Sequence, residues 1–154
     1  SAGRTQNGGI SVINAHNAAV VRHIPNPVQG VRSLQSSHTG NFLLMYTAQN
    51  RVSSWDLSTG ESIYSRSWTS DIEALDLHPN GRFVIVMLKN GEARIADART
   101  FTHIADIPKY WLGIRGAWFS ADGRYLVTLH EHSVIRVAEV VITEHITESD
   151  LSPR

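Results

Sequence analysis

The chain has 154 residues, 42% hydrophobic and 18% charged, a balance typical of one compact globular domain and not of a disordered chain. Its 14 basic residues equal its 14 acidic ones, which excludes the broad electrostatic attraction to nucleic acid or anionic membranes that a basic domain has. Cysteine is absent, which excludes a disulfide framework and a thiolate nucleophile. No apolar run approaches the roughly 20 residues needed to span a bilayer, so we expect a soluble protein, located in either the cytoplasm or the periplasm.

The chain opens with a lead-in, residues 1–9, whose three glycines indicate a flexible segment without a phosphate-binding motif. Residues 10–24 follow, with two short strand-like runs on either side of a polar stretch that begins at Asn14. Because the sequence begins with Ser1 and not with Met, we expect either a processed chain or a piece of a longer polypeptide.

The segment 69–109 shows the predicted strand pattern most clearly. The turn "HPNG" has Pro and Gly where a tight turn needs their backbone angles, and Asn90-Gly91 predicts a second, hairpin turn. The strands around these turns are predicted at residues 72–77, 83–88, 92–96 and 102–107. The second of them is apolar on both faces, so we expect it to pack between neighbouring sheets.

The same pattern recurs in residues 28–68 and 110–147, marked by a turn glycine after the first strand and an acidic residue at the end of the third. The glycines are Gly40, Gly81 and Gly123, and the acidic residues are Asp56, Asp97 and Glu139. Both series advance by 41 and then by 42 residues, and counting back 42 from Asp56 reaches Asn14. Residues 10–24 therefore match the third and fourth strands of a partial unit. A period near 41 with four short strands is typical of β-propeller blades.

With Trp55-Asp56 in "SSWDLSTG" and the turns "HPNGRF" and "SADGRY", the chain resembles the WD40 family and related bacterial β-propellers over residues 10–147. The resemblance implies an all-β fold of four-stranded antiparallel blades around a central channel. No Gly-His pair precedes the first strand of a unit, and the family's Asp between second and third strands is missing. The family's side-chain hydrogen-bond network is therefore not carried over, and a divergent propeller is expected.

Strand counting predicts about three and a half blades, a partial propeller. The half blade lies at 10–24, the blades at 28–68, 69–109 and 110–147, and a polar tail at 148–154. Propellers have about four to eight blades, so this arc does not close by itself. We expect a second chain, or the remaining segment of a propeller, to cover its exposed blade faces.

The first strand of each blade lies innermost in a propeller, and this placement indicates candidate residues at the channel. Arg32, Glu73 and Arg115 stand eight residues before the successive turn glycines. Two guanidinium groups and a carboxylate in one ring could hold an acidic side chain of a protein partner or an anionic ligand. The alternative is that these residues pair with one another and satisfy the channel wall.

Large aromatic residues occupy the predicted loops between blades, namely Trp68 and the pair Tyr110-Trp111. They are candidates for partner binding, because such side chains often anchor protein interfaces. Packing between blades is the alternative. Trp55 and Trp118 fall on predicted strands and are expected in the core.

Eight histidines raise the question of a metal site. Alternation along a strand would put His130 and His132 on one face, but no third ligand is evident nearby, so no metal site is predicted. His38 and His78 lie beside turn glycines and are expected to cap those turns through hydrogen bonds. No arrangement of nucleophile, acid and base stands out.

Two functions follow from this reading. The first is a non-catalytic propeller scaffold that binds protein partners through its channel mouth and interblade loops, with no cofactor. The alternative is part of a propeller enzyme or cofactor carrier of the haem d1 or quinoprotein dehydrogenase type, whose repeats use turns like "NGRF" and "DGRY". Arg32 and Arg115 would then face an anionic cofactor.

Overall fold

The computed structural model describes residues 9–25, 30–108 and 113–141, which form antiparallel β-strands and one turn of 3₁₀ helix. The strands are β1 (Gly9–Ile13), β2 (Val20–Pro25), β3 (Val31–Ser36), β4 (Phe42–Thr47), β5 (Arg51–Asp56), β6 (Ser62–Ser67), β7 (Ile72–Leu77), β8 (Phe83–Leu88), β9 (Ala93–Asp97), β10 (His103–Ile107), β11 (Ile114–Phe119), β12 (Tyr125–His130) and β13 (Ile135–Glu139). The 3₁₀ turn, Glu131–Ser133, lies between β12 and β13.

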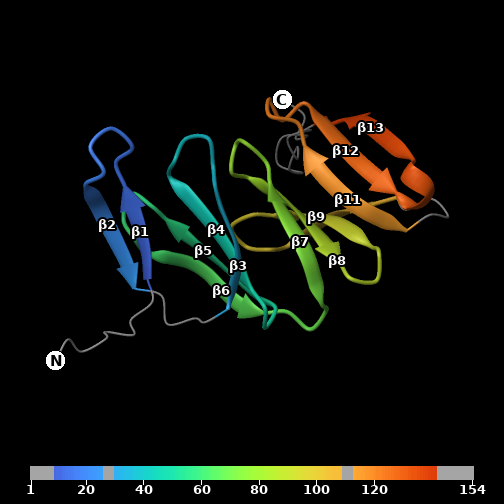
Figure 1. Cartoon of the computed structure of the whole chain (residues 1–154). Coiled ribbons are helices and arrows are strands. Elements are labelled where there is room, and N and C mark those ends of the chain that lie inside the picture. The colour runs from blue at the N-terminus through green and yellow to red at the C-terminus, as the bar shows by residue number, and fades with distance from the viewer. Residues whose placement is uncertain (1–8, 26–29, 109–112, 142–154) are drawn as a thin grey trace, which may run out of the picture.

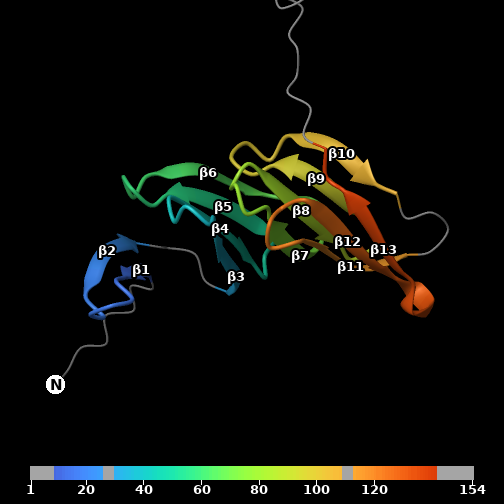
Figure 2. The ribbon, with the colours of Figure 1, turned by 90° about the horizontal axis from the view of Figure 1, so that it is seen from above.

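The strands form sheets that stand side by side in an arc, each built from consecutive strands (Figure 1). β1 and β2 form the first sheet, β3 to β6 the second, β7 to β10 the third, and β11 to β13 belong to the last. Seen from above, β3, β7 and β11 lie along one side of the arc, with β6 and β10 along the other (Figure 2). The predicted all-β partial propeller is confirmed. The lead-in up to residue 8, the tail and the last expected strand of the final blade lie outside the described residues.

The first sheet corresponds to the outer two strands of a blade. Its register shifts between Val12 and Ile13, as the register of β5 with β6 shifts between Ser54 and Trp55, 42 residues later. The connecting turns match as well, because the Asn14 N–H donates to a carbonyl five residues ahead at 2.9 Å, as does the N–H at position 56. Among the described residues, the sheet of β1 and β2 therefore has no counterpart of the inner two strands that the complete blades possess.

Two of the acidic residues that mark the repeat, Asp56 and Asp97, hold turns through their side chains. The Asp56 carboxylate accepts hydrogen bonds from the N–H groups of Ser58 and Thr59 at 2.8 and 3.3 Å. Asp97 accepts from the corresponding two N–H groups at 2.9 and 2.8 Å. Hydrogen bonds from Ser58, led by its side chain, hold the pKa of Asp56 below its ordinary range. These bonds close the turn between the third and fourth strands of a unit, as Asp commonly does at the start of a turn.

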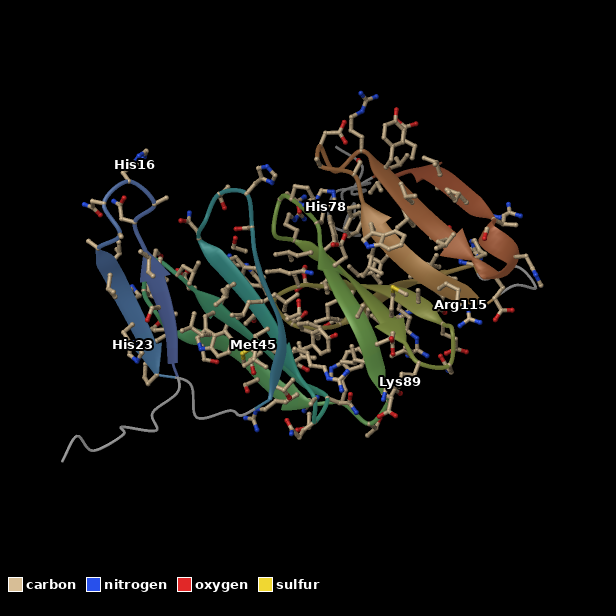
Figure 3. All side chains as sticks on the ribbon, in the orientation of Figure 1. His16, His23, Met45, His78, Lys89 and Arg115 are labelled. Carbon is tan, nitrogen blue, oxygen red and sulfur yellow. The ribbon has the colours of Figure 1, made fainter. Side chains whose placement is uncertain are left out.

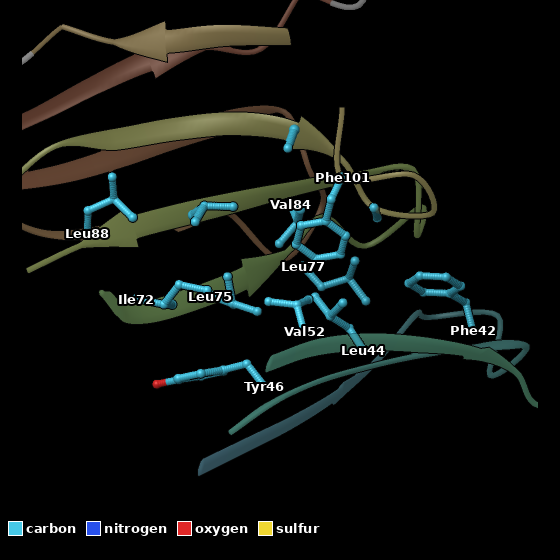
Figure 4. Close-up of a cluster of buried hydrophobic side chains, with 13 residues drawn as sticks. Phe42, Leu44, Tyr46, Val52, Ile72, Leu75, Leu77, Val84, Leu88 and Phe101 are labelled. Atoms are coloured by element: carbon cyan, nitrogen blue, oxygen red, sulfur yellow. The ribbon is translucent and has the colours of Figure 1, made fainter. Parts of the chain in front are cut away.

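The main core lies between the two complete four-stranded sheets (Figure 4). β4 is buried along its whole length, and Val84 to Leu88 of β8 are buried too, which confirms the prediction for the run that is apolar on both faces. The Phe101 ring stacks on Tyr64 of the preceding sheet at 5.1 Å between ring centroids. Burying each such aromatic side chain contributes on the order of 2 kcal/mol.

One polar contact between successive units recurs at an equivalent position. The Gln35 side chain on β3 accepts a hydrogen bond from the Leu77 N–H on β7 at 2.6 Å. Asp76, 41 residues later, accepts from the Phe119 N–H on β11 at 2.8 Å. Burial raises the pKa of Asp76, although the Phe119 N–H and His78 act in the opposite direction. A side chain on one inner strand thus binds the backbone of the next.

The turns after the first strands make a second repeated contact. His78 donates from Nε2 to the Gly123 carbonyl at 2.9 Å and accepts the Asn80 N–H at 3.2 Å, which confirms its predicted role in the turn. His38 instead gives its backbone N–H to the Pro79 carbonyl at 3.0 Å, and its side chain is exposed. In both cases a residue of one turn therefore donates a hydrogen bond to a backbone carbonyl in the turn of the next unit.

The two tryptophans expected in the core differ. Trp55 is 7% exposed, as predicted, but Trp118 is 48% exposed, so its predicted burial was wrong. Trp118 occupies the position of Gln35 and Asp76, from which a side chain reaches toward the following unit. No further unit follows β11 to β13 in the described residues, and the indole folds back over Gly116 of its own strand.

Candidate interaction surface

Arg32, Glu73 and Arg115 occupy the same place in three successive inner strands, as the second residue of β3, β7 and β11. The strand register shifts at each of them, so each is the extra residue of a β-bulge. All three are exposed. We call the edge of the arc that they mark the strand-start edge. The three residues thus occupy equivalent positions in the inner strands, as their common spacing from the turn glycines predicted.

Arg32 and Glu73 flank one buried phenol. The Tyr46 hydroxyl donates to the Glu73 carbonyl at 2.8 Å, and Tyr46 is only 6% exposed. Burial raises the pKa of Tyr46, the Arg32 charge lowers it and the Glu73 charge raises it, so both charges act at the same hydroxyl. In the part of the chain that the structure describes, Arg32 and Glu73 form no ion pair with each other. Their charged groups face solvent.

Arg115 pairs with Glu131, in the loop after β12, at 3.2 Å, and not with Glu73. Their side chains are 68% and 43% exposed, so the pair contributes less than about 1 kcal/mol to stability. Arg115 and Glu131 also line an open hollow of about 420 Å³. Lys89 and Arg115 lie toward one edge of the arc, and His78 lies toward the other (Figure 3). The strand-start edge therefore carries both signs of charge, and the hollow lies at its Arg115 end.

Trp68 is partly buried and packs between the two complete sheets. Its ring meets Phe101 edge-on at 5.9 Å between centroids, and the backbone N–H of Trp68 donates to the Asn50 carbonyl at 2.9 Å. This placement favours packing between blades, and not partner binding, as the role of Trp68. Tyr110 and Trp111, the other aromatic candidates, lie outside the described residues.

The histidines considered as metal ligands do not converge. His130 is buried, with Nε2 2.9 Å from the Thr128 hydroxyl, and His132 is exposed in the 3₁₀ turn with a φ of 59°. Among the described residues, no group of three or more His, Cys, Asp or Glu side chains could hold a metal ion.

Asn50 was missed by the sequence reasoning, although it organises the strand-start edge. Its backbone has a φ of 57°, and its amide donates to the Asp71 carboxylate at 2.7 Å while accepting the Ile72 N–H at 3.2 Å. The bond from Asn50, helped by the charge of Lys89, lowers the pKa of Asp71. The repeat itself could have identified Asn50, because it stands 41 residues before Gly91, in the equivalent hairpin turn. Both residues adopt the left-handed conformation that Asn and Gly tolerate.

Comparisons with known proteins agree with this geometry. Over 123 residues the chain is 25% identical to protein groucho of Drosophila melanogaster, which covers 76% of this chain but only 17% of groucho. The β-propeller domain of Swd1 from Myceliophteria thermophila superposes with a TM-score of 0.68 at 17% identity, over 86% of this chain and 45% of that one. The dihydro-heme d1 dehydrogenase NirN, solved in complex with DHE, gives 0.62 at 13% identity, over 86% and 33%. No family profile matches the chain.

The repeat, the four-stranded antiparallel sheets and these similarities define a β-propeller of the WD40-like kind, present here as an open arc. The chain spans less than half the length of each of the proteins just compared. In the described residues, no helix is long and apolar enough to cross a membrane.

Proposed function

We propose that this WD40-like chain is a non-catalytic scaffold that binds a protein partner through its strand-start edge. The observation that carries the proposal is the placement of Arg32, Glu73 and Arg115 at one bulged position in three successive inner strands, all exposed. A row of fixed charges of both signs suits a partner with complementary charges, because such pairs set register and specificity. The hollow beside Arg115 offers a concave place for one partner side chain.

The test compares two triple variants in quantitative affinity capture from cell extract. One replaces Arg32, Glu73 and Arg115 by Ala, and the matched control replaces three exposed turn arginines, Arg82, Arg99 and Arg124. We expect the strand-start variant to lose bound proteins that the wild type and the control retain. Equal capture by all three proteins would refute the proposal. Urea unfolding of both variants checks that neither substitution set disrupts the fold.

The scaffold proposal also includes completion of the ring by protein outside the described arc, either a second chain or further blades. The open arc and the exposed Trp118 support it. Light scattering on the purified chain provides the check, because a stable dimer would implicate a second copy. The cofactor-carrier alternative has only the fold similarity to NirN behind it. A visible absorbance band in the purified protein would favour that alternative over the scaffold.

A further inference from the structure

Two turns of the third sheet contain the sequence Asn-Gly. Asn80-Gly81 lies in the turn between β7 and β8, and Asn90-Gly91 lies in the turn between β8 and β9. Because glycine has no side chain, its backbone nitrogen can approach the side-chain amide carbon of the asparagine before it. Attack by that nitrogen converts asparagine to a cyclic imide, so both turns are candidates for a covalent change. A further pair, Asn7-Gly8, lies outside the described residues.

The reacting amide is held in the same way in both turns. The Glu92 N–H donates to Oδ1 of Asn90 at 3.0 Å, and the Arg82 N–H donates to Oδ1 of Asn80 at 2.9 Å. Negative charge develops on this oxygen when a nucleophile adds to the amide carbon, and a backbone N–H that already points at it stabilises that charge. The two asparagines therefore have equal chemistry, and their surroundings decide which one reacts.

The glycine nitrogen is also bonded in both turns. The Gly91 N–H donates to the Leu88 carbonyl at 3.0 Å, and the Gly81 N–H donates to the His78 carbonyl at 2.8 Å. Each turn therefore has to open locally before its nitrogen can lose a proton and attack, and exposed turns open more readily than buried ones.

The surroundings of the two turns differ. Gly81 is buried, and a methyl group on it would lie 2.9 Å from Cβ of Ser37 in the preceding unit. The same turn also accepts the His38 N–H at the Pro79 carbonyl. Gly91 is only partly buried, and a methyl group there would meet nothing closer than Cα of Gly113 at 3.5 Å, an ordinary contact. The turn of Asn90 therefore has solvent access and room to open, whereas that of Asn80 is held by its neighbour.

The turn of Asn90 also joins two units. The Gly91 carbonyl accepts the Ile114 N–H at 3.1 Å, at the start of β11 in the next unit. Ile114 directly precedes Arg115, so this bond fixes the backbone beside one of the charges of the strand-start edge. A covalent change at Asn90 therefore acts on the contact between units.

We propose that Asn90 is a site of spontaneous deamidation, with water as the only co-reactant, and that the change loosens the link between the β8–β9 turn and β11. Hydroxide removes the Gly91 N–H proton, and the nitrogen forms a bond to Cγ of Asn90. The side-chain nitrogen takes up a proton from water and leaves as ammonia. A water molecule then opens the cyclic imide at either of its two carbonyl carbons. The inference holds whether or not the strand-start edge binds a partner.

The two products affect the turn differently. Aspartate at position 90 keeps the main chain intact, and its carboxylate can accept the Glu92 N–H as Asp97 accepts the Arg99 N–H. Isoaspartate adds a methylene group to the main chain just before Gly91, which displaces the Gly91 carbonyl from the Ile114 N–H. Both products place a negative charge beside Lys89. Loss of the bond between units is therefore expected of isoaspartate alone.

The experiment incubates the whole 154-residue chain in mildly alkaline buffer, natively and in urea, and follows each asparagine by proteolysis and mass spectrometry. In urea, Asn80 and Asn90 should react at rates within about threefold of each other, because glycine follows both. In the native chain, Asn90 should react at least about tenfold faster than Asn80, because the buried turn opens less readily. The matched control is Asn90→Gln, since the preceding unit has Gln49 at the equivalent position.

Hydrogen exchange tests the consequence for the contact between units. Anion exchange separates the isoaspartate form from the unmodified chain, and exchange at the Ile114 N–H should be faster in the isoaspartate form. Incubated Asn90→Gln and fresh Asn90→Asp should exchange at Ile114 like the fresh wild type. The proposal is overturned if native Asn90 stays intact while the urea sample is converted, or if native Asn80 reacts as fast. Unchanged exchange at Ile114 in the isoaspartate form would refute the loosening of the link.

Discussion

Replacing Gly123 by alanine should destabilise the protein by about 3 kcal/mol. The residue has a φ of 74°, where a side chain costs roughly 1 kcal/mol. The new methyl group would also lie 2.5 Å from Cε1 of His78, so the imidazole has to move. That movement breaks the 2.9 Å bond from His78 to the Gly123 carbonyl and leaves buried polar atoms unpaired, which costs a further ~1–3 kcal/mol.

Gly40→Ala is the matched control, because Gly40 has a φ of 70° in the equivalent turn but nothing within 4 Å of the added methyl group. It should cost only the backbone term of about 1 kcal/mol. Urea unfolding followed by tryptophan fluorescence measures both variants, with equal m-values required for the comparison. If Gly123→Ala costs no more than Gly40→Ala, the contact between the turns does not contribute to stability.

Three further predictions follow from contacts between and within units. Burial raises the pKa of Asp76, so the folded state holds its proton more tightly than the unfolded state. The wild type should lose stability relative to Asp76→Asn as pH rises from the ordinary Asp pKa through the raised value; a flat difference in urea unfolding across that range would contradict this. Phe101→Ala should lower the free energy of unfolding by about 3 kcal/mol, since the ring is buried against Tyr64, and a loss below about 1 kcal/mol in the same assay would disprove that role. Arg115→Ala should change the free energy of unfolding by less than about 1 kcal/mol, because the ion pair with Glu131 is exposed. A larger change in urea unfolding would mean that the pair stabilises the fold.

The strand order could be predicted from the sequence because turn residues report local backbone geometry. Strands 72–77 and 83–88 have their predicted bounds, and the next two begin one residue later than predicted. The spacing of Gly and Asp residues was enough to locate the turns and hence the strands. The conformation of such a turn depends only on residues next to it in the sequence.

Contacts between units could not be predicted in the same way. Gln35 and Asp76 carry no common residue type, and their shared role appears only when the register of adjacent inner strands is known. Trp118 was placed in the core because it lies on a strand, but its burial depends on a unit that does not follow in the described arc. The pairing of Arg115 with Glu131 likewise depends on the loop after β12.

The polar link between units is asymmetric, and this has an evolutionary consequence. The unit that comes first contributes a side chain, Gln35 or Asp76, whereas the unit that follows contributes only a main-chain N–H. Every residue except proline has that group, so this one bond needs no particular amino acid in the following unit. A unit duplicated or exchanged within a gene would therefore form this bond without a substitution at the receiving position, whereas the contact between the turns still requires a glycine at the place of Gly123. Repeats joined in this way can diverge in sequence, as these have, while the arc that they build is retained.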